Sequence, residues 1–339
     1  MKLRIQPRIV FLGVVLCFFG IIILAREHRP SFLRPGLHLN AYVSTSDGGV
    51  TVVDLVKLGA IAHVSVGPGL SGMREHPTRD EIWGASGPGG YIWVLDTRTN
   101  QIAARVSVGA QPLAVDFSRD GSRVYATSSG TDTLVAIDCR TRSILARART
   151  GAEPVIAHVT PNGEMILVVN QKDGTLGIHD AATLALRNAV PTVSKPEDVA
   201  IVPDSSLAFV LSRSERRISV VDLQRAVLVT NLDLAGEPTQ MLLKPDGGEL
   251  YVLSPEAHGL QVINTSTHEV GDYLLVGSAP SQGILLPDAS GLFVSDSAAG
   301  RVANRRRSLF DTACTDQLAE RFVLALMDFI QAMNALAVF

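Results

Sequence analysis

The stretch that decides the fold is PLAVDFSRDGSRVYATSSGTDTLVAIDCRTRSILARARTGAE, residues 112–153. It contains four short apolar segments, separated by polar turns such as Asp120-Gly121, at residues 113–117, 123–127, 134–137 and 143–149. Short runs of this kind, bounded by turn-forming residues, are typical of β-strands. The stretch therefore predicts four strands joined by tight turns.

The same pattern recurs every 42 residues without an insertion. One column of the repeat is an apolar-Asp pair, which recurs at Val53-Asp54, Leu95-Asp96, Ile137-Asp138, His179-Asp180 and Val221-Asp222 and ends, altered, at Ile263-Asn264. A second column is Pro112, Pro154, Pro196, Pro238 and Pro280, and a third consists of turns such as Asn162-Gly163 and Asp246-Gly247. A fixed period indicates a repeat architecture, and four strands per 42 residues indicate propeller blades. We predict an all-β fold, a β-propeller of about seven four-stranded blades.

Two of these columns have structural explanations. An Asp after the third strand can accept hydrogen bonds from backbone N–H groups two or three residues later, which fixes the hairpin. A Pro-Asp-Gly sequence sets φ at its first residue and supplies a residue that tolerates positive φ. We therefore assign both columns to the scaffold and not to catalysis.

The repeat resembles the YVTN-type β-propeller repeat over residues 41–302. The resemblance is carried by Val124-Tyr125-Ala126-Thr127, Leu250-Tyr251-Val252-Leu253, Leu95-Asp96-Thr97 and Val108-Gly109-Ala110-Gln111-Pro112. It implies seven blades around a central channel, and it implies no single activity.

The repeat fails after residue 302. Its register expects an apolar-Asp pair where Arg305-Arg306 stand, and a proline where Phe322 stands. Apolar residues follow instead at helical spacing, at Leu318, Phe322, Leu326, Phe329, Met333 and Leu336. We predict an incomplete last blade and an atypical, helical C-terminal tail over residues 303–339. The alternative, which the abruptness of the break slightly favours, is that a reading-frame shift near codon 303 replaced the strands that close the ring.

The chain begins with Lys2, Arg4 and Arg8, followed by an apolar run over residues 9–25. A basic start before an apolar run is typical of an export signal, and this run is near the lower length of a membrane helix. We predict an N-terminal membrane helix that acts as a signal-anchor (residues 1–25), then a linker (26–40) and the propeller. The propeller is expected to be extracytoplasmic, on the periplasmic side in a Gram-negative cell, and anchored in the cytoplasmic membrane. The alternative is secretion after cleavage of a signal peptide.

Composition excludes several classes of function. The net charge of -3, without a basic stripe in the repeats, argues against nucleic acid as a partner. Cys17, Cys139 and Cys314 are too few and too scattered for a disulfide framework or a metal site. No nucleophile elbow, zinc motif or phosphate-binding glycine loop occurs. We predict no catalytic residue, no metal and no cofactor.

Propellers bind ligands with the junctions before the first strands and with the loops between second and third strands. In this chain those segments offer Glu153, Lys195, Glu197, Asp198, Glu237, Gln240, Gln282, Lys172, Asp173, Arg213, Glu215 and His258 as candidate ligand-binding residues. The leading hypothesis is a membrane-anchored binding or scaffold module for a protein or polar ligand. The alternatives are a propeller enzyme or enzyme subunit, lactonase-like or periplasmic dehydrogenase-like, and a damaged product without a function of its own.

Overall fold

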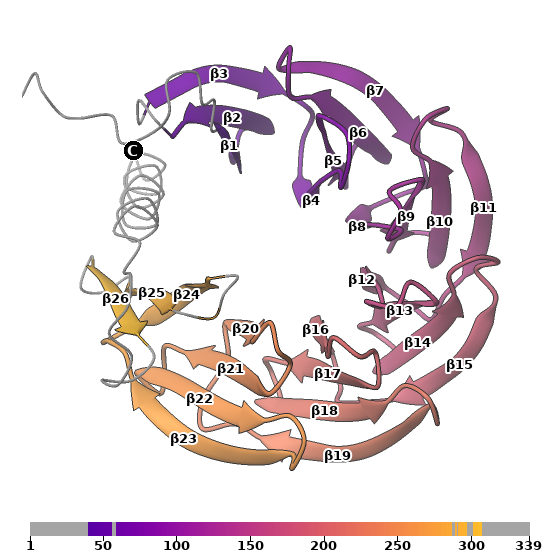
Figure 1. Cartoon of the computed structure of the whole chain (residues 1–339). Coiled ribbons are helices and arrows are strands. Elements are labelled where there is room, and N and C mark those ends of the chain that lie inside the picture. Colours follow the sequence, from indigo (N-terminus) through magenta and orange to yellow (C-terminus); the bar gives the residue numbers. More distant parts are fainter. Residues whose placement is uncertain (1–39, 56–58, 287–288, 290, 297–300, 307–339) are drawn as a thin grey trace, which may run out of the picture.

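The computed structural model of the chain describes residues 40–55, 59–286, 289, 291–296 and 301–306. All regular secondary structure within these residues is β-strand, and the strands form seven antiparallel sheets. Figure 1 shows the sheets arranged around a common centre in the order of the sequence. Five sheets are four-stranded, and the first and last contain three described strands each. The predicted all-β fold of four-stranded antiparallel units is confirmed.

Each sheet is built from strands that follow one another in the chain. The strands nearest the centre are β4 (Leu70–Glu75), β8 (Pro112–Phe117), β12 (Pro154–Val159), β16 (Asp198–Ile201), β20 (Gln240–Leu243) and β24 (Pro280–Leu285). The second strands are β1 (Asn40–Ser44), β5 (Glu81–Ser86), β9 (Arg123–Ser128), β13 (Met165–Asn170), β17 (Leu207–Ser212), β21 (Glu249–Ser254) and β25 (Gly291–Asp296).

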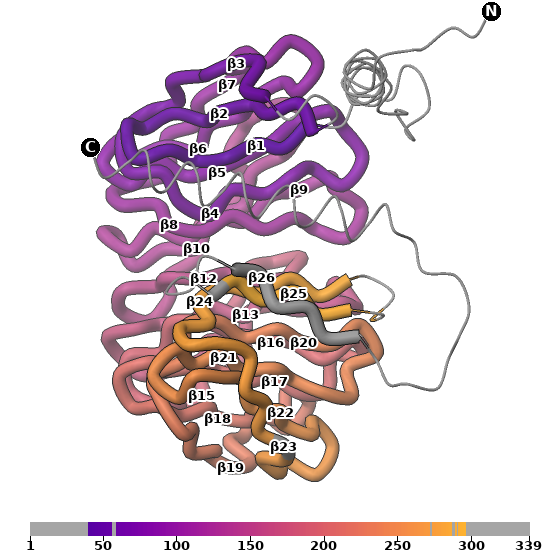
Figure 2. The backbone as a smooth tube through the Cα atoms, turned by 90° about the vertical axis from the view of Figure 1, so that its left-hand side faces the viewer, coloured from indigo at the N-terminus to yellow at the C-terminus, as the bar shows by residue number. Residues whose placement is uncertain are grey.

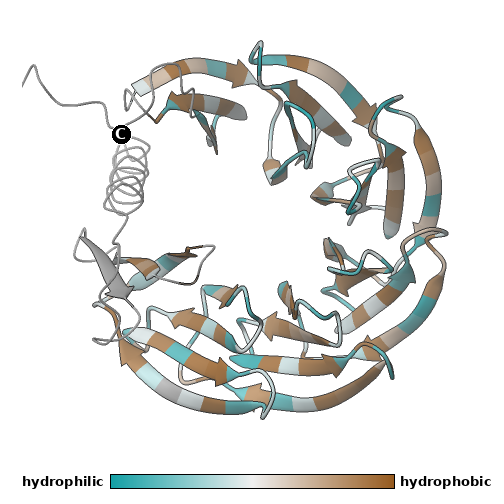
Figure 3. Cartoon of the chain, in the orientation of Figure 1, coloured by the Kyte–Doolittle hydropathy of each residue, from teal (hydrophilic) through white to brown (hydrophobic). Residues whose placement is uncertain are grey.

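The third strands are β2 (Gly49–Asp54), β6 (Tyr91–Asp96), β10 (Thr133–Asp138), β14 (Thr175–Asp180), β18 (Arg217–Asp222), β22 (Gly259–Asn264) and β26 (Arg301–Arg306). The outermost strands are β3 (Gly59–Ser65), β7 (Gln101–Ser107), β11 (Ile144–Arg149), β15 (Leu186–Pro191), β19 (Val227–Asp233) and β23 (Glu269–Leu275). Along β7, exposed residues alternate with less exposed ones, because one face of this strand is exposed to solvent, and both hydrophilic and hydrophobic residues occur along the outermost strands (Figure 3).

The aspartate column closes the hairpins between third and fourth strands, as the sequence predicts. Asp138 Oδ1 accepts hydrogen bonds from the backbone N–H groups of Arg140 (2.9 Å) and Thr141 (2.6 Å). Asp222 accepts the equivalent pair from Gln224 and Arg225, both at 2.9 Å. Asn264 does the same with Ser266 and Thr267, both at 3.0 Å. An amide oxygen therefore replaces the carboxylate in this turn.

The hydrophobic core is a series of clusters, each shared by two neighbouring sheets. One cluster joins Trp83 and Val94 of the second sheet to Val115 and Val135 of the third. Another joins Trp93 of the second sheet to Val50 of the first. The middle strands are buried on both faces and read as continuous apolar runs for that reason. Burial between sheets, and not within one sheet, therefore holds the ring together.

His179 occupies a core position that other repeats fill with Leu95, Ile137 or Val221. Its side chain is buried, and Nδ1 lies 3.0 Å from the carbonyl oxygen of Leu184. Its Nε2 has no hydrogen-bond partner. Only one of the two nitrogens of this buried imidazole therefore has a hydrogen-bond partner.

The first and last sheets are seen together in Figure 2, which views the ring from the side on which they lie. Among the described residues, β1 pairs only with β2, and β26 pairs only with β25. Strand β26 ends at Arg306, so regular β-structure continues past residue 302, where the repeat pattern placed the end of the propeller. The predicted helical tail, except for residues 303–306, lies outside the described residues, as does the predicted membrane segment. No helix in the described part of the chain is long and apolar enough to cross a membrane.

Candidate functional site

The innermost strands share one register, which brings equivalent residues of successive repeats to the same level around the centre. Arg74, Asp116 and His158 each pair with the matching residue of the second strand, namely Trp83, Tyr125 and Leu167. The next three strands carry Ala200, Leu242 and Ile284 at this level. Polar residues therefore occupy this level on β4, β8 and β12 and apolar residues on β16, β20 and β24.

A second level lies two residues earlier on β8, β12, β16, β20 and β24, on the same face. Its occupants on these strands are Ala114, Ile156, Asp198, Gln240 and Gln282, and on β4, where a bulge lies between Ser71 and Arg74, the residue paired at this level is Ser71. The long polar side chains of this level stand on β16, β20 and β24. The two levels together form a polar band that changes height between β12 and β16.

Arg74, Asp116 and His158 form a cluster across three sheets. Arg74 Nε lies 3.7 Å from Asp116 Oδ1, and Arg74 Nη2 lies 3.1 Å from His158 Nδ1. His158 Nδ1 also lies 3.2 Å from Asp116 Oδ2. The side chains of Asp116 and His158 are 18% and 23% exposed, whereas that of Arg74 is 46% exposed. The arginine is thus the member of the cluster that solvent and ligands can reach most easily.

The two contacts of His158 Nδ1 exclude each other chemically. If Nδ1 carries a proton, it can donate a hydrogen bond to Asp116. It then cannot form a hydrogen bond with the Arg74 guanidinium, because both groups are donors. If Nδ1 is unprotonated, it accepts from Arg74, and the proton of the neutral ring is on Nε2. The side chain can therefore exchange one partner for the other by moving a single proton.

Asp116 is held as a carboxylate. Burial by itself opposes its charge, but the hydrogen bond with His158 and the charge of Arg74 outweigh burial, so the pKa of Asp116 lies below its usual value. The backbone N–H groups of Val159 (2.9 Å) and Phe117 (3.0 Å) also donate to its two oxygens. Its acceptor positions are largely occupied by the protein itself.

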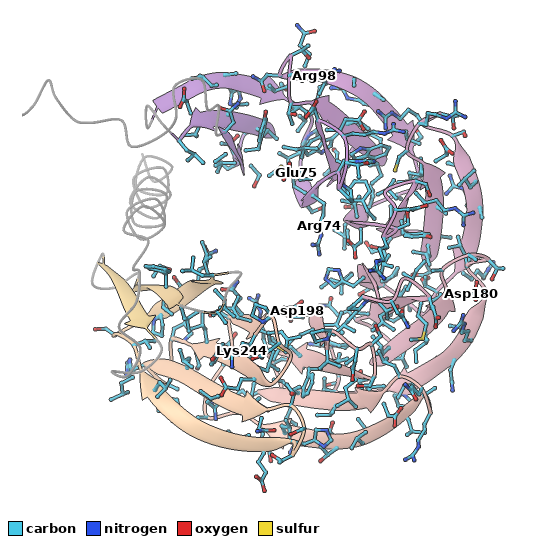
Figure 4. All side chains as sticks on the ribbon, viewed as in Figure 1. Arg74, Glu75, Arg98, Asp180, Asp198 and Lys244 are labelled. Carbon is cyan, nitrogen blue, oxygen red and sulfur yellow. The ribbon has the colours of Figure 1, made fainter. Side chains whose placement is uncertain are left out.

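Asp198 lies in a different environment, although its strand is the next one along. Its one hydrogen bond among the described residues comes from the adjacent N–H of Val199, at 2.8 Å. Burial raises the pKa of Asp198, while that hydrogen bond and the charges of His158, Arg213 and Arg74 act in the opposite sense. Figure 4 shows Arg74 on β4 and Asp198 on β16 at the inner side of the ring.

Carboxylates of the loops between second and third strands bind the backbone of the junctions before the first strands, and these loops and junctions together form the mouth of the propeller. Asp173 Oδ2 accepts a hydrogen bond from the N–H of Ala152 at 2.6 Å, and Asp132 Oδ1 accepts one from the N–H of Glu153 at 2.9 Å. Lys172 Nζ lies 3.8 Å from Glu153 Oε1, and both side chains are exposed. These groups attach the loops of the third and fourth sheets to the connection between β11 and β12.

Further along the ring, predicted ligand-binding residues likewise bind other groups of the protein. Glu197 Oε2 lies 3.1 Å from Arg213 Nε, and Arg213 Nη2 donates to the carbonyl oxygen of Thr239 at 3.1 Å. Ser194 donates to the carboxylate of Glu215. Lys195 is exposed and makes no ion pair with another described residue. Of this group, Lys195 alone keeps a side chain that the scaffold does not use.

The last predicted residues are mostly bound to their own surroundings. The backbone N–H of Glu237 donates to Glu256 at 3.0 Å, and Gln240 Oε1 accepts from the N–H of Gly283 at 2.7 Å. His258 Nδ1 contacts the carbonyl oxygen of Ser278. The side chain of Gln282 is exposed. The structure thus brings Asp198, Gln240 and Gln282 to one level and leaves the others spread over the mouth.

None of the three members of the central cluster, Arg74, Asp116 and His158, is among the candidate residues that the sequence predicts. A signal was present, because 74, 116 and 158 are three successive copies of one repeat position. No group of three or more His, Cys, Asp and Glu in the described residues is arranged to hold a metal ion.

Comparison with known proteins supports the propeller. A model of the YNCE-like β-propeller family matches residues 90–290. No curated protein matches the chain. Among solved structures, a chain of the Kuenenia stuttgartiensis hydrazine synthase has a similar fold, with a TM-score of 0.64 and 15% sequence identity. That similarity covers 82% of this chain and 99% of the other.

Proposed function

Because this chain belongs to the YNCE-like β-propeller family, we propose that it is a membrane-anchored, extracytoplasmic module that binds a polar ligand, free or displayed by a protein, at the centre of its ring. In this proposal the ring has seven blades of the YVTN type, and residues 9–25 hold it at the membrane. The observation that carries the proposal is the polar band of Arg74, Asp116, His158 and Asp198 on four successive innermost strands.

The polar groups of this band resemble a binding site more than a set of groups that stabilise the fold. The mouth carboxylates Asp132 and Asp173 satisfy backbone N–H groups of a junction. Arg74 and Asp198, in contrast, keep polar atoms without a partner among the described residues, namely Arg74 Nη1 and Asp198 Oδ2. Polar groups that the fold does not satisfy are available to a ligand.

The test of this site is saturation-transfer NMR of the full chain in mild detergent with propionate, propylamine, β-alanine and glucose. We expect at least one of these compounds to bind, and Arg74→Gln or Asp198→Asn to weaken that binding at least tenfold. Arg140→Gln, which removes an exposed charge in the turn between β10 and β11, is the control and is expected to bind as the unaltered chain does. Binding that both central variants retain would place the ligand elsewhere.

The membrane anchor has its own test. The full chain and a chain without residues 1–25 are expressed side by side, and membranes are washed with alkaline carbonate. We expect the full chain to stay with the membrane and to be digested by protease added from the extracytoplasmic side. A full chain that is washed off, or that is protected from the protease, would contradict the proposed anchor or the proposed side.

A second candidate is a propeller enzyme or enzyme subunit, lactonase-like or periplasmic dehydrogenase-like. The specific observation in its favour is the His158–Asp116 pair beside a partly buried Asp198, which is a set of titratable groups on one inner wall. Turnover of a lactone that Asp198→Ala abolishes, or a Soret band in the purified chain, would support it. Unchanged turnover in Asp198→Ala would remove this residue from any catalytic role.

A further inference from the structure

The chemical class of the ligand can be argued from the charges of the polar band, and the argument rests on the proposed function. At the level of Asp198, the six described innermost strands carry Ser71, Ala114, Ile156, Asp198, Gln240 and Gln282. Among these six residues Asp198 is the only charged one. Its neighbours on β20 and β24 are amides, which can hydrogen-bond a ligand but cannot neutralise the carboxylate.

Asp198 lacks a close cationic partner among the described residues. Its Oδ1 accepts the N–H of Val199, and nothing described donates to Oδ2. Burial raises the pKa of Asp198 because the carboxylate loses hydration, and its backbone hydrogen bond and the more distant charges of His158, Arg213 and Arg74 compensate for that loss only in part. A ligand that brings an ammonium group to Oδ2 would supply that compensation.

The other level carries the guanidinium of Arg74 and the carboxylate of Asp116, and only the guanidinium is largely exposed. Asp116 accepts hydrogen bonds from two backbone N–H groups and faces Arg74, so it has little capacity left to bind a ligand. Arg74 uses Nε and Nη2 in the cluster, which leaves Nη1 and nearly half of the side chain exposed. If His158 accepts from Arg74 through Nδ1, its Nε2–H is a second donor beside the guanidinium. This side of the band can therefore hold a carboxylate.

The two levels are separated by two residues of strand, which is about 7 Å of rise. We infer that the centre of the ring binds a small zwitterion, with its ammonium group on Asp198 and its carboxylate on Arg74 and His158. A simple anion would be attracted by Arg74 but repelled by Asp198. A simple cation would be attracted by Asp198 but repelled by Arg74. Arg74 reaches across β8 to His158 on β12, the innermost strand next to the one that carries Asp198. The band thus favours a ligand that carries both charges, as amino acids do.

The experiment compares zwitterions with compounds that carry only one of the two charges, which we call their halves. Glycine, β-alanine and γ-aminobutyrate are titrated into the full chain in mild detergent, together with propionate and propylamine, and dissociation constants are measured by NMR. We expect at least one zwitterion to bind tenfold or more tightly than both halves. Asp198→Asn and Arg74→Gln should each remove that preference. Glu75→Gln, which removes a carboxylate beside Arg74 on the other face of β4, should keep it.

The other outcomes separate this inference from the proposed function. If propionate or propylamine binds as tightly as every zwitterion and depends on Arg74 or Asp198, the central site stands and the zwitterion is wrong. If none of the five compounds binds, while thermal unfolding shows a folded chain, the zwitterion is overturned. Binding of another polar compound that depends on the same residues would then decide the proposed function by itself. Arg74→Lys, which keeps the charge and the fold, should retain part of the preference. This variant serves as the control in case Arg74→Gln does not fold.

Discussion

Thr127 and Val169 occupy the same position of the repeat on β9 and β13, and both are buried. Thr127 Oγ1 has no hydrogen-bond partner, whereas Val169 has no polar group to satisfy. We expect Thr127→Val to raise the free energy of unfolding by about 1 kcal/mol, because it removes a buried hydroxyl at constant shape. Urea unfolding measures the change. The reverse substitution, Val169→Thr, should lower stability, and a loss of stability in Thr127→Val would contradict the argument.

His76 makes stability depend on pH. Its Nδ1 accepts hydrogen bonds from the N–H groups of Thr78 and Arg79, both at 3.1 Å, so the proton of the neutral ring is on Nε2, 2.9 Å from the carbonyl oxygen of Gly121. Burial is the main cause that lowers the pKa of His76 below 6.5, and burial lowers that of His179 likewise. The unfolded chain therefore binds protons near pH 6.5 that the folded chain excludes.

The two neutral rings contribute to the free energy of unfolding above pH 6.5. This contribution is lost as the pH falls through that value toward the lower pKa of the folded state. We expect the thermal midpoint to fall between pH 7 and pH 5. The double variant His76→Gln/His179→Leu should show a shallower fall over the same range. An unchanged slope in that variant would assign the acid sensitivity to other groups.

At the scale of the element, the hairpin between β18 and β19 has a residue in the left-handed region. Ala226 has φ of 55°, and the same position of the second sheet is Asn100 with φ of 54°. Asparagine tolerates this conformation better than alanine does, whereas a β-branched residue is strained in it. We expect Ala226→Asn to raise stability by about 0.5 kcal/mol and Ala226→Val to lower it by about 1 kcal/mol or more. Equal melting temperatures for the two variants would contradict the prediction.

The same hairpin tests whether the aspartate column is structural. Asp222 accepts two backbone hydrogen bonds, and Asn264 makes the equivalent pair in the next sheet. We expect Asp222→Ala to cost about 1 kcal/mol and Asp222→Asn to cost little, because an amide oxygen serves as well as a carboxylate here. Ligand binding should be the same in both folded variants. A loss of binding in Asp222→Asn would give the column a role beyond the scaffold.

At the scale of the whole molecule, the first sheet tests how the ring ends. The described residues leave one edge of β1 without a paired strand, whereas β9 lies between β8 and β10. We expect the amides of β1 that do not pair with β2 to exchange with solvent much faster than the amides of β9, because an edge strand leaves its N–H groups open to water. Hydrogen exchange measures this. Equal protection would show that a strand outside the described residues completes the first sheet.

The repeat in the sequence was sufficient to predict the strands and the hairpins. The bonds that Asp138 and Asp222 make are local, between residues two or three apart, so a motif carries them. The partners of Asp132 and Asp173 belong to another connection, and only the packing of the sheets decides them. The central cluster required the fold, because Arg74 and His158 are 84 residues apart and meet only when three sheets stand side by side.

The order of strands in each sheet also has a consequence for how the chain acquires its structure. Every described strand pairs with the strand immediately before or after it in the chain. Such pairing keeps each sheet within one continuous stretch of the chain. Each blade can therefore form as soon as its own 42 residues have left the ribosome, and it can shelter the apolar face of the blade before it. No described sheet has to wait for a partner from a distant part of the sequence, whereas any strand from the C-terminal end that completes the first sheet has to wait until synthesis is finished.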